Sequence, residues 1–371
     1  MKISAPLVLS LLLGLVLLPL LARAQTVTLP RPSPLASVMQ RIGLSDVSVT
    51  YSRPSVRDRE VWGELVPWGF TDLGFGTAKA SPWRAGANEN TVFTTSTPLR
   101  IEGERLPAGT YGLFMAIAPS GEVTVIFSHD HESWGSYFYD PALDALRITT
   151  QWAEAPFSEL LTYQFSNVTE SSATLELRWE AKRIPFLLEA ETPLLTMESL
   201  ARELRGEKGF VHRSWVNAAR YALQHDLQLE TALEWIDQAL TGPLVGRETF
   251  AAYELKAQIL EHLGRPGAAE AVMDRAVQIG SASDLFNYGR TLLALEQPER
   301  AFEVLQLNVE RHPGQWPAAF GVARAYAALG ENDQAIEWLE RATADLSAQD
   351  TANRETVQRA LEKLRRGERL D

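Results

Sequence analysis

The stretch Ala173-Thr174-Leu175-Glu176-Leu177-Arg178-Trp179-Glu180 alternates strictly between apolar and polar side chains. Successive side chains of a β-strand point to opposite faces, so this alternation predicts a strand with its apolar face buried and its polar face toward solvent. Similar short patterns recur at 47–52, 91–95, 99–102, 111–118, 123–127, 146–152, 159–166 and 184–189. Some nine short strands separated by turn residues predict an antiparallel β-sandwich over residues 46–190.

The periodicity becomes helical after Thr192-Pro193. Small residues recur 32 and 34 residues apart, at Ala257, Gly289 and Ala323. Small side chains at such a spacing let paired helices approach closely. The pattern resembles the tetratricopeptide repeat, whose period is about 34 residues.

This resemblance covers about residues 214–346 in roughly four repeats, and Glu355–Leu364 is the expected capping helix. We therefore predict an α+β chain of two domains. A linker and leading helix at 191–213 would connect the sandwich to an all-α solenoid at 214–366. The solenoid would either bind a protein or peptide partner in its concave groove or merely stabilise the sandwich.

The N-terminal residues 1–24 have the features of a secretory signal peptide. Lys2 precedes an apolar run of 15 residues from Leu7 to Leu21, and Ala22-Arg23-Ala24 follows as a cleavage pattern. A retained anchor is the alternative, although a spanning helix needs about 20 apolar residues. We expect an exported protein, periplasmic or extracellular, that begins at Gln25 and has no membrane span after cleavage. A Pro-rich extended segment at 25–45 would precede the sandwich.

Composition excludes several classes of function. The chain of 371 residues has a formal net charge of −12 and no cysteine. Negative charge repels nucleic acid, and the lack of cysteine excludes disulfides and thiolate metal sites. No P-loop, dinucleotide fingerprint or G-x-S-x-G motif is present, so we predict no nucleic-acid partner and no cofactor.

Segment 81–91 gathers an indole, a guanidinium, an amide and a carboxylate around the small residues 85–87. Two interpretations remain open. The segment is either the wall of a polar pocket or a structural corner, in which Arg84 binds backbone carbonyls and Trp83 fills the core. A partly buried guanidinium is costly without an anion or several carbonyls.

We further expect Arg84 to pair with a carboxylate. In this hypothesis Arg84 and Glu89 share one polar cluster with Asp140 or Arg147.

Several motifs in the N-terminal half resemble one family. They are Tyr51-Ser52-Arg53-Pro54-Ser55-Val56, Gly63-Glu64-Leu65-Val66-Pro67, Trp83-Arg84-Ala85-Gly86-Ala87-Asn88-Glu89, Leu106-Pro107-Ala108-Gly109-Thr110-Tyr111-Gly112-Leu113, Trp134-Gly135 and Tyr139-Asp140. Together they resemble the domain of unknown function 2911, a family of secreted bacterial proteins, from about Pro34 to Glu189. The resemblance implies a β domain in an exported protein, often followed by tetratricopeptide-like helices. It implies no established activity.

The candidate ligand-binding residues are polar or aromatic and lie in or near these motifs: Arg53, Trp83, Arg84, Asn88, Glu89, Trp134, Asp140, Asp144 and Arg147. If they converge, the guanidinium groups would bind a carboxylate or phosphate, and the indoles would stack on a ring. The carboxylates would bind sugar hydroxyls or act as general acid and base. An internal salt-bridge network is the structural alternative.

His129 and His131 would share one face of an extended segment, so they are weak candidates for a metal site that lacks a third ligand. A polar turn is the alternative there.

Two functions remain open. The first is an exported binding or scaffold protein, with a small polar or carbohydrate ligand on the β domain and a protein partner on the repeats. The second is a hydrolase that acts on carbohydrate or cell-envelope material through its carboxylates and arginines. No catalytic residue is assigned.

Overall fold

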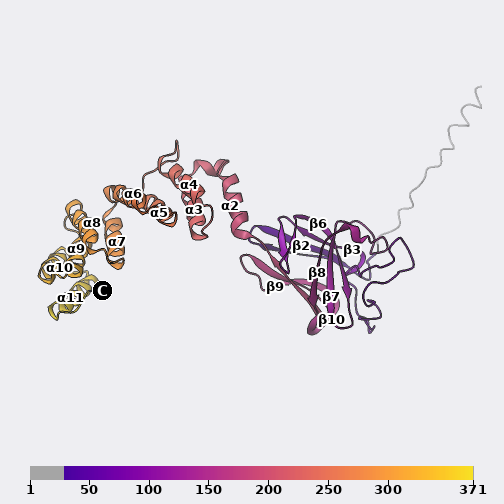
Figure 1. The fold of residues 1–371 in the computed structure, drawn as a ribbon. Helices are drawn as coiled ribbons and strands as arrows, with labels where there is room; N and C mark the ends of the chain where they lie inside the picture. The colour runs from indigo at the N-terminus through magenta and orange to yellow at the C-terminus, as the bar shows by residue number, and fades with distance from the viewer. Residues whose placement is uncertain (1–28, 371) are drawn as a thin grey trace, which may run out of the picture. The chain divides into compact units, whose positions relative to one another are not determined.

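The computed structural model describes residues 29–370 (Figure 1). The predicted signal peptide at 1–24 lies outside the described residues. The chain divides into two compact units, and the division falls between Thr192 and Pro193. Each unit is considered by itself below.

The N-terminal unit contains two antiparallel sheets. The six-stranded sheet has the order β1 (Leu35–Ile42), β2 (Ser45–Ser52), β3 (Ala87–Thr95), β6 (Gly109–Ile117), β7 (Glu122–Ser128) and β8 (Asp144–Gln151). The four-stranded sheet has the order β5 (Glu104–Leu106), β4 (Leu99–Ile101), β10 (Ser172–Glu189) and β9 (Ala153–Ser166). The predicted antiparallel β architecture is confirmed.

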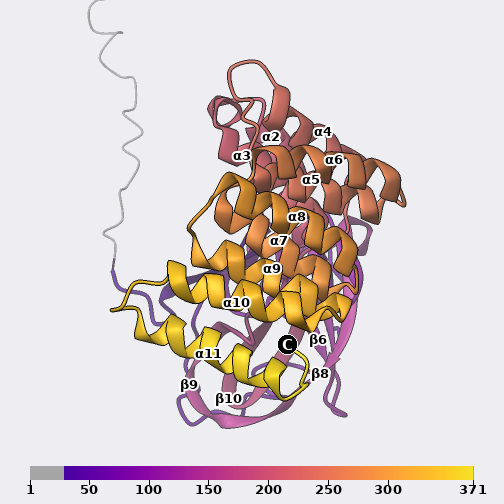
Figure 2. The ribbon, with the colours of Figure 1, turned by 90° about the vertical axis from the view of Figure 1, so that its left-hand side faces the viewer.

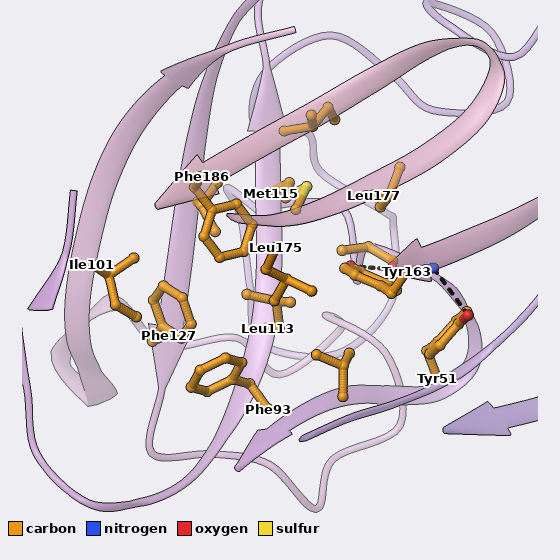
Figure 3. Close-up of a cluster of buried hydrophobic side chains, with 14 of the residues drawn as sticks. Tyr51, Phe93, Ile101, Leu113, Met115, Phe127, Tyr163, Leu175, Leu177 and Phe186 are labelled. Carbon is orange, nitrogen blue, oxygen red and sulfur yellow. Dashed lines mark hydrogen bonds between the residues drawn. The ribbon is translucent and has the colours of Figure 1, made fainter. Parts of the chain in front are cut away.

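A single hydrophobic core joins the two sheets (Figure 3). Phe127 of β7 contacts both sheets, with ring centroids 5.1 Å from Phe93 of β3 and 6.2 Å from Phe186 of β10. The backbone N–H of Tyr163 donates a 2.9 Å hydrogen bond to the Tyr51 hydroxyl, which ties β9 to β2. Since aromatic pairs favour such edge-to-face packing, these contacts hold the sheets face to face.

The apolar residues of the opening stretch are buried, as their alternation predicts. Glu176, predicted to face solvent, is instead fully buried. Its carboxylate accepts hydrogen bonds from Gln164 at 2.5 Å, Arg178 at 3.0 Å and Arg183 at 3.2 Å. Burial opposes ionisation, but these donors outweigh it and lower the pKa of Glu176. The prediction failed because alternation identifies a polar face and does not show what covers it.

Two strand predictions need correction. Residues 173–180 and 184–189 belong to one 18-residue strand, because register shifts around Glu180 interrupt its alternation without ending it. Residues 35–42, expected in an extended segment outside the sandwich, form β1 at the sheet edge. Leu35 and Met39 of β1 are exposed, so its hydrophobic pattern gives no sign of a buried face. The short strand β5 was also missed.

The C-terminal unit is helical, and its helices are shown in Figure 2. α2 (Thr192–Glu203) comes first, and the pairs are α3 (His212–Gln224) with α4 (Leu229–Thr241), α5 (Phe250–His262) with α6 (Pro266–Ile279), α7 (Ala282–Ala294) with α8 (Pro298–Arg311), and α9 (Trp316–Leu329) with α10 (Asn332–Asp345). α11 (Thr351–Arg365) occupies the position expected for the capping helix. Short 3₁₀ turns lie at Pro141–Leu143 and Glu207–Phe210.

The recurring small residues lie where helices meet. Ala257 and Ala323 are buried, and Gly289 is buried against Leu305 of the paired helix. A Cβ built on Gly289 would come within 2.5 Å of Leu305 Cδ2, closer than side chains pack. The helix pair α7–α8 therefore requires a residue without a side chain here. Within residues 29–370, no helix is long and apolar enough to cross a membrane.

Candidate functional site

A pocket of about 390 Å³ lies in the N-terminal unit beside segment 83–88. Its polar lining comes mainly from the long connection between β2 and β3. The polar and aromatic side chains that line it are Ser33, Ser55, Arg57, Arg59, Trp83, Arg84, Asn88 and Trp179. Three of the sequence candidates, Trp83, Arg84 and Asn88, therefore line one pocket.

The backbone of this connection has left-handed turns at two places along the chain. Arg57 and Asp58 have left-handed φ angles of 49° and 55°, and Ala85 has a φ of 49°. Ala85 is fully buried, and its carbonyl accepts a 3.0 Å hydrogen bond from the Tyr163 hydroxyl. Left-handed backbone is uncommon for residues other than glycine, so the surrounding contacts must hold this conformation.

Trp83 is fixed by both its backbone and its ring. Its backbone exchanges two 2.8 Å hydrogen bonds with Met115 of β6. Its indole stacks on Trp179 at 5.9 Å with an interplanar angle of 15°, and meets Trp62 edge to face at 6.0 Å. Trp83 thus packs against the core and also lines the pocket, so the two interpretations of this segment do not exclude each other.

Arg84 is held by groups other than carboxylates. Its Nη1 donates a 2.6 Å hydrogen bond to the Asn88 carbonyl, and its guanidinium lies 5.7 Å from the centroid of the Tyr137 ring. Gly135 allows this approach, because a Cβ there would lie 2.6 Å from the guanidinium carbon. Within the described chain Arg84 forms no ion pair with a carboxylate. The predicted pairing is wrong, because a carbonyl and a π-face stabilise the cation instead.

Glu89 turns away from Arg84 and pairs with Arg31. The hydrogen bond from Arg31 holds the pKa of Glu89 below its ordinary value. Glu89 does not line the pocket. Strand alternation explains this separation, since neighbouring residues at the start of β3 point in different directions.

Asp144 and Arg147 form a second cluster with Tyr139. Arg147 Nε donates to Asp144 at 2.6 Å, Arg147 Nη2 donates to the Tyr139 hydroxyl at 2.8 Å, and that hydroxyl donates to Asp144 at 2.7 Å. Burial is the main cause of a raised pKa for Tyr139. Asp140 nearby accepts a 2.9 Å hydrogen bond from the Ala142 N–H and caps the 3₁₀ turn. Asp144 and Arg147 form an ion pair, as the structural alternative predicted, whereas Asp140 forms only the cap, and none of these residues lines the pocket.

Arg53 and Trp134 also lie outside the pocket lining. Arg53 donates to the Leu161 carbonyl at 2.9 Å and to Thr162 Oγ1 at 2.5 Å, which ties its segment to β9. Trp134 is 54% exposed. The predicted set is therefore divided among several places instead of converging on one.

Sequence reasoning missed Arg57 and Arg59. Both lie just after the Tyr51–Val56 motif, and this position next to a family motif is the sequence feature that could have marked them as site candidates. Arg59 Nη2 and Nε donate to the carbonyls of Ser55 at 2.5 Å and Val56 at 3.0 Å. Arg57 is exposed, and its guanidinium has no hydrogen bond or ion pair within residues 29–370.

His129 and His131, the weak candidates for a metal site, follow the end of β7 in the described part of the chain. No group of three or more His, Cys, Asp or Glu side chains that could hold a metal gathers there. His129 instead donates its backbone N–H to the Leu143 carbonyl at 2.8 Å, and its ring lies 5.5 Å from the Tyr111 ring.

The helical unit has two adjoining hollows that share Arg324 and Leu370, and we call them together the α7–α11 groove. Their volumes are about 610 Å³ and 330 Å³. The cationic side chains of the lining are Arg290, Arg324, Arg359 and Lys363. Among described residues neither lining includes a carboxylate, although the whole chain is acidic. Apolar side chains, among them Phe320 and Leu293, complete the groove.

Comparison with family models gives two matches. Residues 33–188 match the family described as "Protein of unknown function (DUF2911)", and residues 250–279 and 317–344 match the tetratricopeptide repeat. The DUF2911 match precedes the tetratricopeptide repeat matches along the chain, and the order predicted from the motifs is confirmed. Such repeats form a scaffold for protein interactions.

Several solved structures are similar to part of the chain. The crystal structure of MamA is 15% identical, with a TM-score of 0.29, and the match covers 40% of this chain and 80% of that one. YrrB, described as a TPR protein with an unusual peptide-binding site, is 21% identical, with a TM-score of 0.28 and coverages of 45% and 85%. Pseudomonas aeruginosa pilF is 18% identical, with a TM-score of 0.30 and coverages of 42% and 68%. No curated protein matches the chain.

Proposed function

We propose that this protein is an exported scaffold whose helical repeats bind a segment of a protein partner in the α7–α11 groove. The observation that carries the proposal is the groove itself, in which apolar and cationic side chains from three helices line two adjoining hollows. Helical repeats bind extended segments along such surfaces, with apolar pockets for anchoring side chains and polar groups for orientation.

Filling the groove tests this proposal. Ala294 is exposed and lines the groove, whereas Ala268 is exposed on α6 and does not line it. Short peptides selected from a random displayed library on the full chain would serve as probes. We expect Ala294→Trp to weaken their binding by about tenfold or more, because an indole takes the space of a peptide side chain. Ala268→Trp should bind them as the wild type does, and equal binding by both variants would contradict the proposal.

Export is supported by the apolar run that ends in Ala22-Arg23-Ala24 and by the resemblance to a secreted family. We expect the protein recovered from outside the cytoplasm to begin at Gln25. Mass spectrometry of its N-terminal peptide tests this expectation, and an intact Met1 would contradict it.

The proposal also assigns a small polar ligand to the pocket of the β domain. Three guanidinium groups, an amide and two indoles at one pocket support ligand binding, because small-molecule sites combine apolar walls with a few polar groups. Hydrolysis by paired carboxylates would need two such groups beside the scissile bond, and the lining includes none. The hydrolase alternative therefore finds no support in this pocket.

A further inference from the structure

We infer that the pocket of the β domain binds a small molecule that carries an oxyanion, carboxylate or phosphate, and a planar ring. The inference rests on the proposed ligand pocket and names its ligand class. The pocket volume of about 390 Å³ suits a ligand of that size, within the usual range of about 300–1,000 Å³ for small-molecule sites.

The charge of the lining is the first argument. Arg57, Arg59 and Arg84 all line the pocket, and its lining has no carboxylate. Within the described chain, none of the three forms an ion pair. Like charges gathered at one pocket repel each other, and an entering anion would relieve that repulsion.

The fixed geometry of two of these arginines is the second argument. Arg84 is held by the Asn88 carbonyl, and Arg59 is held by the carbonyls of Ser55 and Val56. Each guanidinium has five N–H donors, so these bonds position the group and leave donors unused. Arg57 adds a third guanidinium, which forms no hydrogen bond or ion pair within residues 29–370. Preorganised donors bind an oxyanion with little loss of entropy.

The aromatic wall is the third argument. Trp83 is partly exposed and lies beside the arginines, with its ring backed by Trp179. Trp179 also lines the pocket, and its buried Nε1 has no hydrogen-bond partner in the described chain. A flat indole favours a planar ring next to the anionic group.

Calorimetric titration of the full chain tests this inference with defined probes. The oxyanion probes are phenyl phosphate, benzoate and inorganic phosphate, and the neutral probes are phenol and glucose. We expect phenyl phosphate or benzoate to bind, which also identifies the oxyanion. Inorganic phosphate should bind more weakly because it lacks the ring, and the neutral probes should bind least.

A matched pair of variants locates the binding. Arg57 and Arg105 are both exposed, and neither side chain forms a described hydrogen bond or ion pair, but Arg105 lies on β5 outside the pocket lining. Because a charged hydrogen bond is lost, Arg57→Gln should weaken the binding of the ring-bearing anion by about tenfold. Arg105→Gln should leave it unchanged. Equal weakening by both variants would show a general charge effect and overturn the inference.

The outcomes separate the ligand class from the ligand site. If glucose or phenol binds and Trp83→Leu abolishes that binding, while the anions do not bind, the anionic class is wrong and the proposed pocket stands. If no probe binds, the anionic inference fails as well as the small-ligand proposal for the β domain. The proposal for the helical repeats is tested separately.

Discussion

The two units are stabilised in different ways. In the β-sandwich one core connects strands far apart in sequence, as in the hydrogen bond between Tyr51 and Tyr163, 112 residues apart. In the helical unit three hydrophobic clusters follow one another along the chain, and Gly289 packs against Leu305 of its own pair. A destabilising substitution in the sandwich should therefore lower the stability of that whole unit. In the repeats, its effect should remain near the altered helix pair.

The largest expected effect is the loss of Phe127 from the sandwich core. Phe127 is fully buried between Phe93 and Phe186. Phe127→Ala should lower the free energy of unfolding of the sandwich by about 3–5 kcal/mol, because lost burial and the remaining cavity add together. Chemical denaturation followed by tryptophan fluorescence measures this change.

Phe157 provides the matched control, since it is 63% exposed. Phe157→Ala should change the same unfolding free energy by no more than about 0.5 kcal/mol. A similar loss in both variants would show that the shared core does not dominate the stability of the sandwich.

A smaller effect is expected from the buried carboxylate of Glu176. Glu176→Gln should lower the stability of the sandwich near neutral pH by about 1.5–3 kcal/mol, because hydrogen bonds to the charged group are lost. The folded-state pKa of Glu176 is depressed, so its contribution is present above the unfolded pKa and is lost as pH falls through the folded pKa. Stability of the wild type should thus fall in acid.

Denaturation at a series of acidic pH values tests this linkage. The difference between the wild type and Glu176→Gln should shrink as pH falls from the ordinary Glu range of about 4.3. A difference that stays constant with pH would mean that the charge of Glu176 does not stabilise the fold.

The most local effect is expected in the helical repeats. Gly289→Trp should lower stability by about 1–3 kcal/mol, because the side chain meets Leu305 and forces α7 from α8. Loss of helical circular dichroism should occur at lower denaturant, while the transition of the sandwich remains unchanged. If the sandwich transition also moved, the two units would not unfold independently.

Gly267 is the control for this change. It lies in α6, and a Cβ added there would meet nothing within 4 Å. Gly267→Trp should therefore leave the helical transition nearly unchanged, within about 0.5 kcal/mol.

Much of the fold could be predicted because the spacing of apolar and small residues along the chain indicates which side chains are buried. The buried apolar residues of β10 follow its alternation, and the small residues at 257, 289 and 323 lie at helix contacts. β1 could not be predicted, because apolar side chains lie on both of its faces: Leu35 and Met39 are exposed, while Val38 and Ile42 face the core. The length of β10 was also missed, since a bulge looks like the end of a strand.

The candidate site was predictable only in part. Segment 83–88 contains three residues of the pocket, and their chemistry pointed to a polar wall. Asp144 and Arg147 were grouped with them on chemistry alone, but they bond to Tyr139 instead. Polar residues do not encode their partners, because a guanidinium can donate hydrogen bonds to a carbonyl or to a carboxylate and can also lie over an aromatic ring.

The sequence by itself determined the order and class of the two domains, because the periods of two and 3.6 residues are properties of the local backbone. It also determined which helix positions must be small. Only the tertiary structure decided that Arg57, Arg59 and Arg84 line one pocket while Glu89 turns to Arg31. Which groups meet depends on the path of long loops and on left-handed turns such as that at Ala85, and no local period encodes these.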